Sequence, residues 1–254
     1  MSAVIRRAFV QEKGNGRLDP EMRQVAEELR RRGVPVDLFT EKRLLRRQLA
    51  LAPDTLVAGY VPVVLGALQQ LGVPAPEPDD YPACLRALLH RRIWESTVGE
   101  VEGAENEGRS AAVFVKPKGR VKQFTGFVVE SRADLWRFGS VSRRQLVYCS
   151  DVVRWVSEHR VFVIDGAIVG VRPYEGDPAV KPDEGVVAGA VSALGAAGAA
   201  VAGFGIDFGV LASGATALVE RNDGFSLGSY GLPDALYTDL LIARWRELTG
   251  AASA

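Results

Sequence analysis

The chain has 254 residues, 47% of them hydrophobic and 24% charged, which is the composition of a globular protein with one large domain or two closely packed ones. Its 31 basic residues balance 31 acidic residues, so no overall charge attracts nucleic acid or an anionic membrane. Two cysteines far apart exclude a disulfide framework and a cysteine-ligated zinc site, and they predict a reducing, cytoplasmic location.

The first 80 residues predict a small parallel α/β domain, because short apolar strands alternate with helices. Asp19 and Pro20 are a start signal for the first helix, and Gly33 is its stop signal. A proline-rich, acidic stretch at residues 72–82 marks a boundary, so we expect domains at 1–80 and 81–254. The predicted strands are residues 4–10, 34–39 and 55–60, and the helices after them include residues 20–32, 44–49 and 63–71.

The rest of the chain predicts an α+β domain with mainly antiparallel strands and two lobes, at about 90–148 and 149–254. Charged and glycine-rich residues 99–110 predict a mobile loop. The uncharged, alanine-rich stretch 185–206 predicts a buried helix leading into a buried strand, and not a membrane span. Strands are predicted at 111–116, 124–130, 144–149, 205–211 and 216–222, a hairpin at 159–174 with its turn at Asp165-Gly166, and helices through Leu88-Leu89 and at 182–200 and 237–248.

A lysine-rich hairpin is the first candidate for chemistry. An apolar strand ends at Lys116, and Pro117 prevents that strand from continuing as a central one. Lys118 and Lys122 follow in the next few residues. Cations this close repel each other, so they are stable in water or around an anion, and a triphosphate is a natural partner. The alternative is an exposed basic hairpin tip.

The second candidate lies where residues 144–149 end and the next strand begins. Backbone groups of Tyr148, Cys149 and Ser150 could contact a planar base, and Asp151 or Glu158 could hold ribose hydroxyls. Arg160, which keeps its charge, would suit a carboxylate or a phosphorylated intermediate. The alternative is a surface loop with ordinary ion pairs.

The third candidate is a set of oxygen ligands on two neighbouring strands. Glu220 and Asn222 are two residues apart, so they share one face of a strand, and Asp207 lies on the strand before it. Magnesium prefers such hard oxygen donors, and a bound cation would offset the cost of buried carboxylates. Hydrogen-bonded capping of strand ends is the alternative. Arg221 must point off this face or find an anion of its own.

In this order, four segments resemble the stand-alone ATP-grasp clade that is named for one shared arginine and two shared lysines. They are FVKPKGRVKQFTG, SEHRVFVIDG, GIDFGV and LVERNDGFSLGSYGL, with RRIW upstream. The resemblance covers roughly residues 91–232, and the preceding unit resembles the domain that usually comes before an ATP-grasp core. It implies a carboxylate–amine ligase that uses ATP and Mg2+, forms an acyl phosphate and then an amide.

The resemblance also assigns roles by position. Lys116, Lys118 and Lys122 would contact phosphates, and Arg92 would be the shared arginine. The nucleotide would further contact Tyr148, Cys149, Ser150, Asp151 and Glu158. Mg2+ would be held by Asp207, Glu220 and Asn222. Arg160 and Arg172 would face the acyl phosphate or the acceptor.

The sequence departs from the usual pattern at two points. The phosphate loop has few glycines, and Arg221 stands where an apolar residue is commoner. A nucleotide-binding module that no longer catalyses is therefore one alternative. A nucleic-acid partner for the arginine clusters is a weaker one, since aromatic side chains are not interleaved with them. Whether the acceptor is an amino acid, a peptide or a protein terminus is left open, as is the oligomeric state.

Overall fold

The computed structural model describes residues 5–108, 111–119 and 123–250. Its N-terminal unit is a three-stranded parallel sheet in the order β2-β1-β3, as the alternation of strands and helices predicts. Pro20 opens α1, and Gly33, with φ of +75°, follows its end. The elements are β1 (Arg7–Gln11), α1 (Pro20–Arg31), β2 (Val36–Phe39), α2 (Glu41–Leu45), β3 (Thr55–Ala58) and α3 (Val61–Gln70).

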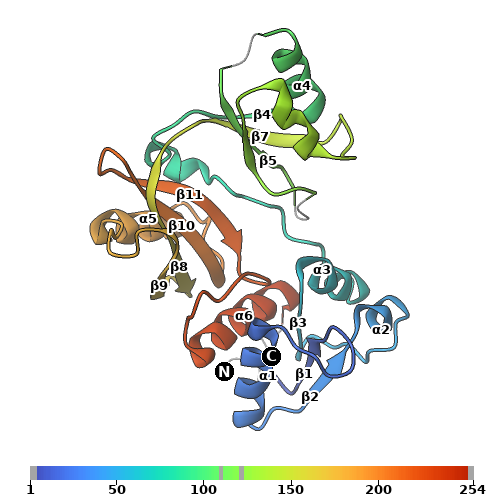
Figure 1. The fold of residues 1–254 in the computed structure, drawn as a ribbon. Coiled ribbons are helices and arrows are strands. Elements are labelled where there is room, and N and C mark those ends of the chain that lie inside the picture. The colour runs from blue at the N-terminus through green and yellow to red at the C-terminus, as the bar shows by residue number, and fades with distance from the viewer. Residues whose placement is uncertain (1–4, 109–110, 120–122, 251–254) are drawn as a thin grey trace.

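The small lobe, in green at the top of Figure 1, is an antiparallel sheet in the order β4-β7-β5-β6. The prediction of a mobile loop at residues 99–110 was wrong, because α4 occupies residues up to Asn106. The expected helix through Leu88 is a 3-10 helix, and a second 3-10 helix was not predicted. The elements are η1 (Ala83–Leu88), β4 (Ile93–Thr97), α4 (Val98–Asn106), β5 (Val113–Pro117), β6 (Phe127–Val129), η2 (Arg132–Phe138) and β7 (Leu146–Asp151).

The large lobe is a second antiparallel sheet, in the order β11-β10-β8-β9. The predicted hairpin turn is confirmed: Asp165 and Gly166 both have positive φ, +47° and +78°. Asp183 caps the helix that was predicted at residues 182–200, since its side chain accepts a hydrogen bond from the Val186 amide. The elements are β8 (Trp155–Ile164), β9 (Ala167–Gly176), α5 (Glu184–Ala196), β10 (Gly203–Leu211) and β11 (Thr216–Asp223).

The C-terminal helix α6 (Asp234–Thr249) returns to the N-terminal unit, and Figure 1 shows it beside α1 and β3. Tyr237, Leu240 and Trp245 of α6 are buried in one core with side chains of the first sheet. The stretch at 185–206 forms α5 and the start of buried β10, as expected. No helix within the described ranges is long and apolar enough to cross a membrane.

Candidate active site

A cleft of about 830 Å³ lies where the N-terminal unit, the small lobe and the large lobe meet. The N-terminal unit supplies the start of α1, the loop after β3 and the start of α3. The small lobe supplies β5, and the large lobe supplies β8 and β11. Residues 76–80, which connect the first unit to the lobes, line it as well. The cleft is therefore bounded by segments that are distant in sequence.

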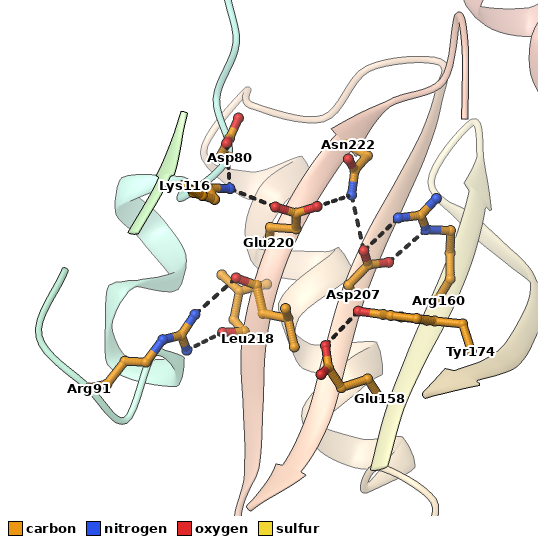
Figure 2. Close-up of polar contacts among 11 residues, drawn as sticks. Asp80, Arg91, Lys116, Glu158, Arg160, Tyr174, Asp207, Leu218, Glu220 and Asn222 are labelled. Atoms are coloured by element: carbon orange, nitrogen blue, oxygen red, sulfur yellow. Dashed lines mark hydrogen bonds and ion pairs between the residues drawn. The ribbon is translucent and has the colours of Figure 1, made fainter. Parts of the chain in front are cut away.

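Lys116 brings an ammonium group into this cleft at the end of β5, a strand that is otherwise apolar. Its side chain is buried, and Nζ lies 2.6 Å from Asp80 Oδ2 and 2.6 Å from Glu220 Oε2 (Figure 2). Burial alone would lower the pKa of Lys116, but the charges of Glu220 and Asp80 outweigh it and raise that pKa. Lys116 thus stays protonated and links the two lobes electrostatically.

The three predicted oxygen ligands do come together. Asp207 of β10 and Glu220 of β11 are directly opposite in the ladder, and Asp207 is 1% exposed. Asn222 Nδ2 donates to Asp207 Oδ2 at 3.1 Å and to Glu220 Oε1 at 3.2 Å, as Figure 2 shows. The Asn222 side-chain amide therefore contacts both carboxylates.

Arg160 of β8 contacts Asp207 from the side of β10 that faces away from β11. It is opposite Asp207 in the ladder and donates to it through Nε at 2.7 Å and Nη2 at 2.6 Å. Burial alone would lower the pKa of Arg160, but the hydrogen bonds and charge of Asp207 raise it. The rings of Tyr174 and Tyr230 lie 5.9 and 4.9 Å from the guanidinium carbon.

This donor set suits a hard divalent cation. Two carboxylates and an amide oxygen are the ligand types that Mg2+ takes, with water and phosphate oxygens in the remaining positions. Across the residues that the structure describes, no three His, Cys, Asp or Glu side chains form a metal-ligating group. The candidate ligands are instead Asp207, Glu220 and Asn222, whose acidic members lie beside Lys116 and Arg160.

Arg221 points off the ligand face, as the alternation of the strand requires. Its Nη1 donates to the Ala199 carbonyl at 2.8 Å, and Nη2 lies 3.6 Å from Asp79. Both alternatives posed by the sequence are thus realised: the side chain leaves the face and meets a carboxylate.

Residues 88–240 match the model of an ATP-grasp domain, family 2 of the clade that is named for one arginine and two lysines. The chain belongs to this ATP-grasp family. The ordered motifs that suggested the clade from sequence lie inside the matched region.

Solved structures share the ATP-grasp fold over nearly their whole length. D-cycloserine synthetase DcsG has a TM-score of 0.57 at 13% identity and covers 96% of this chain and 98% of its own. D-alanine–D-alanine ligase from Bacillus anthracis has a TM-score of 0.57 at 15% identity, over 96% and 97% of the two chains. The macrocyclase MdnC, bound with precursor peptide MdnA from Microcystis aeruginosa, has a TM-score of 0.53 at 10% identity, over 93% and 99%. No curated protein matches the sequence.

Glu158 also joins the ATP-grasp cleft. It accepts a hydrogen bond from the Tyr174 hydroxyl at 2.7 Å, and both side chains line the cleft. Burial raises the pKa of Glu158, with smaller contributions from neighbouring carboxylates. Its predicted role at the ribose stays a prediction.

Arg92, the predicted shared arginine, lies outside the cleft. Its side chain is 83% exposed and makes a bidentate contact with Asp151, another predicted nucleotide contact, at distances down to 2.7 Å. The neighbouring Arg91 is half-buried instead, and donates to the Leu218 carbonyl at 2.7 Å and the Val219 carbonyl at 3.0 Å (Figure 2). Burial lowers the pKa of Arg91. The sequence RRIW does not distinguish the two.

The other predicted residues of the small lobe are close to Lys116 or buried behind it. The Tyr148 ring lies 5.6 Å from Lys116 Nζ and 5.3 Å from Lys118 Nζ, and Lys118 pairs with Glu95. The Cys149 side chain belongs to the lobe's apolar core, where burial raises the pKa of its thiol to about 11. Ser150 Oγ donates to the Asp151 carbonyl.

Arg172, predicted to face the acyl phosphate or the acceptor, is not brought into the cluster. Arg172 lies on β9 and donates from Nε to the Gly231 carbonyl at 3.2 Å. Lys122 lies outside the described residues.

Sequence reasoning missed Asp80 and Tyr81. The stretch at 72–82 was interpreted only as a domain boundary, yet Asp80 contacts Lys116, and the Tyr81 ring packs edge-on against Tyr148 at 5.0 Å. The acidic pair Asp79-Asp80 in an otherwise proline-rich connection was the available signal.

Proposed function

We propose that this ATP-grasp protein is an ATP- and Mg2+-dependent ligase that joins a carboxylate to an amine. One observation carries the proposal: Lys116 of the small lobe faces Glu220, Asn222, Asp207 and Arg160 of the large lobe across one cleft. A lysine opposed to oxygen ligands is an arrangement suited to holding a magnesium-bound polyphosphate.

The nucleotide would lie between the two lobes. Its phosphates would contact Lys116 and Lys118, with Lys122 as the second clade lysine. The strand end from Tyr148 to Asp151 would flank the adenine, and Glu158 would hold the ribose. Support comes from the position of Lys116 and Glu158 on the wall of the same cleft.

Asp207, Glu220 and Asn222 would hold Mg2+. The ion would neutralise the phosphate oxygens during transfer. The protein's own residues position the reactants and keep their charges fixed: Arg160 remains a cation at any relevant pH and would face the acyl phosphate, with Arg172 further along β9.

The reaction would proceed in two steps. A carboxylate oxygen of the first substrate attacks the γ-phosphorus of ATP, the bond to the β-phosphate oxygen breaks, and ADP leaves an acyl phosphate behind. The amine of the second substrate then attacks the acyl carbon. The bond to phosphate breaks, the amine loses a proton, and an amide and inorganic phosphate result.

Amino acids or peptides are the substrates we propose to test first. D-alanine–D-alanine ligase and a macrocyclase bound with its precursor peptide are among the proteins of the same fold. Their identity of 15% or less transfers the fold alone, so the chemistry rests on the cleft. Use of ATP agrees with the cytoplasmic location that two free cysteines predict.

The test is ADP release across a panel of carboxylates and amines, with hydroxylamine present to trap acyl phosphate. We expect trapped hydroxamate with the true carboxylate even when no amine is added. Glu220→Gln keeps the size of the side chain, removes one magnesium-ligating charge and should lower turnover at least about a hundredfold. ADP release at the normal rate from this variant would refute the metal assignment.

The same experiment decides the alternative of a lapsed module. Such a protein would bind MgADP, measured by calorimetry, and release no ADP with any member of the panel. Trapped hydroxamate would exclude it.

A further inference from the structure

The connection between the N-terminal unit and the lobes lies along the active-site cleft. We name residues 76–81 the strap. Figure 1 shows this segment leaving α3 and running to η1, and residues 76–80 line the cleft. The strap is therefore part of the cleft wall as well as a linker.

Contacts to both lobes hold the strap in place. The Asp80 carbonyl accepts a hydrogen bond from the Arg221 amide of β11 at 2.9 Å, so the strap binds the free edge of the large sheet. The Asp79 carboxylate lies 3.6 Å from the Arg221 guanidinium. Tyr81 packs against Tyr148, and its ring centroid lies 4.6 Å from Lys116 Nζ.

The Asp80 side chain makes the contact that matters for function. Its carboxylate lies 2.6 Å from Lys116 Nζ, on the ammonium group that would bind phosphate. A phosphate oxygen at Lys116 would have to share the ammonium with Asp80 and would bring a like charge next to it, which is unfavourable in a partly buried site. Glu220, the other partner of Lys116, differs because the proposed metal would compensate its charge.

We propose that Asp80 is an internal competitor for the nucleotide: its carboxylate occupies the phosphate-binding lysine, and the strap must release Lys116 before ATP can bind. This inference rests on the proposed function. If only a fraction of the molecules has Lys116 free of Asp80, the apparent dissociation constant for nucleotide equals the intrinsic constant divided by that fraction. Because the strap also leads to the N-terminal unit, nucleotide binding would change the link between that unit and the lobes.

Calorimetry with MgADP and with the magnesium complex of the β,γ-imido analogue of ATP tests the competition. We expect Asp80→Asn, which keeps the shape and loses the charge, to bind both nucleotides about fivefold more tightly or better. The matched control is Asp37→Asn, because the Asp37 carboxylate forms an exposed ion pair with Arg7 and does not line the cleft; its nucleotide affinity should stay within about twofold. A residue that merely supports the fold would not improve binding when it is changed.

Unchanged or weaker binding by Asp80→Asn would overturn the inference while leaving the proposed function intact. Absence of nucleotide binding by the wild type and by both variants would overturn both proposals. If Asp80→Asn does not fold, hydrogen exchange of the wild-type protein decides: MgADP should speed exchange of the Arg221 amide, whose acceptor is the Asp80 carbonyl. Equal or slower exchange at that amide would refute release of the strap.

Discussion

Arg91 and Arg92 are adjacent in sequence and have opposite surroundings. Arg91 lies against the Trp155 ring, 5.2 Å from its centroid, and satisfies two carbonyl groups of β11. Arg92 extends into solvent and pairs with Asp151. The first joins the small lobe to the large lobe, and the second remains within the small lobe's own edge.

Substitution to alanine should separate the two arginines. Arg91→Ala leaves the Leu218 and Val219 carbonyls without their donor, so we expect a loss of about 1.5–3 kcal/mol in the free energy of unfolding. Arg92→Ala should leave stability unchanged, because exposed ion pairs contribute little. Urea denaturation of both variants checks this. Lost turnover in a stable Arg92→Ala protein would support the catalytic role that the resemblance gives to Arg92.

His159 predicts a pH dependence of stability. It is buried on β8, and its Nδ1 has no hydrogen-bond partner within the described part of the chain. Burial lowers the pKa of His159, aided by the charge of Lys181. The unfolded chain therefore binds a proton near the usual pKa of about 6.5 while the folded protein does not, so stability is lost as the pH falls below that value.

The comparison that isolates this effect is His159→Leu against wild type at pH 7.5, 6.5 and 5.5. Urea unfolding of the wild type should show a decline toward pH 5.5, at most about 1.4 kcal/mol per pH unit from this one group. The variant should lack that part of the decline. Parallel pH profiles for the two proteins would show that His159 is protonated equally in the folded and unfolded states.

At the level of residues, the spacing of side chains along one strand was easier to predict than ion pairs between residues that are distant in the sequence. The two-residue spacing of Glu220 and Asn222 places both on one face, and the structure confirms that they meet Asp207. The bidentate pair of Arg160 and Asp207 depends on the register between β8 and β10, which β9 and α5 separate in the sequence, and residue order does not reveal that register. Asp80 was missed for a similar reason, since its contact with Lys116 spans 36 residues.

Helix α4 forms where a loop was predicted, and local capping explains why. Its sequence, VGEVEGAEN, contains two glycines and few apolar residues, so its pattern is typical of a loop. The helix is fixed by a capping box, in which Thr97 accepts from the Glu100 amide and the Glu100 side chain accepts from the Thr97 amide at 2.9 Å. Val98 and Val101 then bury its inner face.

We expect Thr97→Ala to lower the free energy of unfolding by about 1 kcal/mol, since it leaves an amide at the helix start without its acceptor. Thr97→Ser is the control, because it keeps the hydroxyl oxygen and should stay close to wild type. The urea midpoints of the three proteins give the comparison. Equal midpoints for the alanine and serine variants would mean that packing alone forms α4.

Most strands were predicted from the sequence, although β4 was not. The parallel order of the first unit follows from strict alternation of strands and helices, and the Asp165-Gly166 turn follows from the need for positive φ at both residues. The sequence does not reveal where α6 packs, because its apolar pattern fits any apolar surface.

At the scale of the whole molecule, the predicted division at residue 80 still awaits a test, and α6 bears on it. The helix completes the core of the first unit: Trp245 is 1% exposed, and its Nε1 donates to the Pro53 carbonyl at 3.1 Å. The first 80 residues thus depend on a helix that lies more than 150 positions later in the chain.

Trp245→Ala should therefore destabilise the first unit, by about 3–5 kcal/mol, the usual cost of a large cavity. Trp136→Ala is the matched control, since that ring is 78% exposed and its loss should change the free energy of unfolding by less than about 0.5 kcal/mol. Guanidinium denaturation followed by circular dichroism measures both. A small effect of Trp245→Ala would indicate that residues 1–80 are stable without α6.

The return of α6 to the first sheet sets an order for folding during protein synthesis. The ribosome synthesises residues 1–80 long before residues 234–249. The apolar faces of α1 and β3 therefore lack their contact with α6 while the ATP-grasp lobes are still being translated. The apolar surface that α6 covers in the N-terminal unit therefore stays exposed until α6 has been made, and α6 also brings Tyr237 to the wall of the cleft.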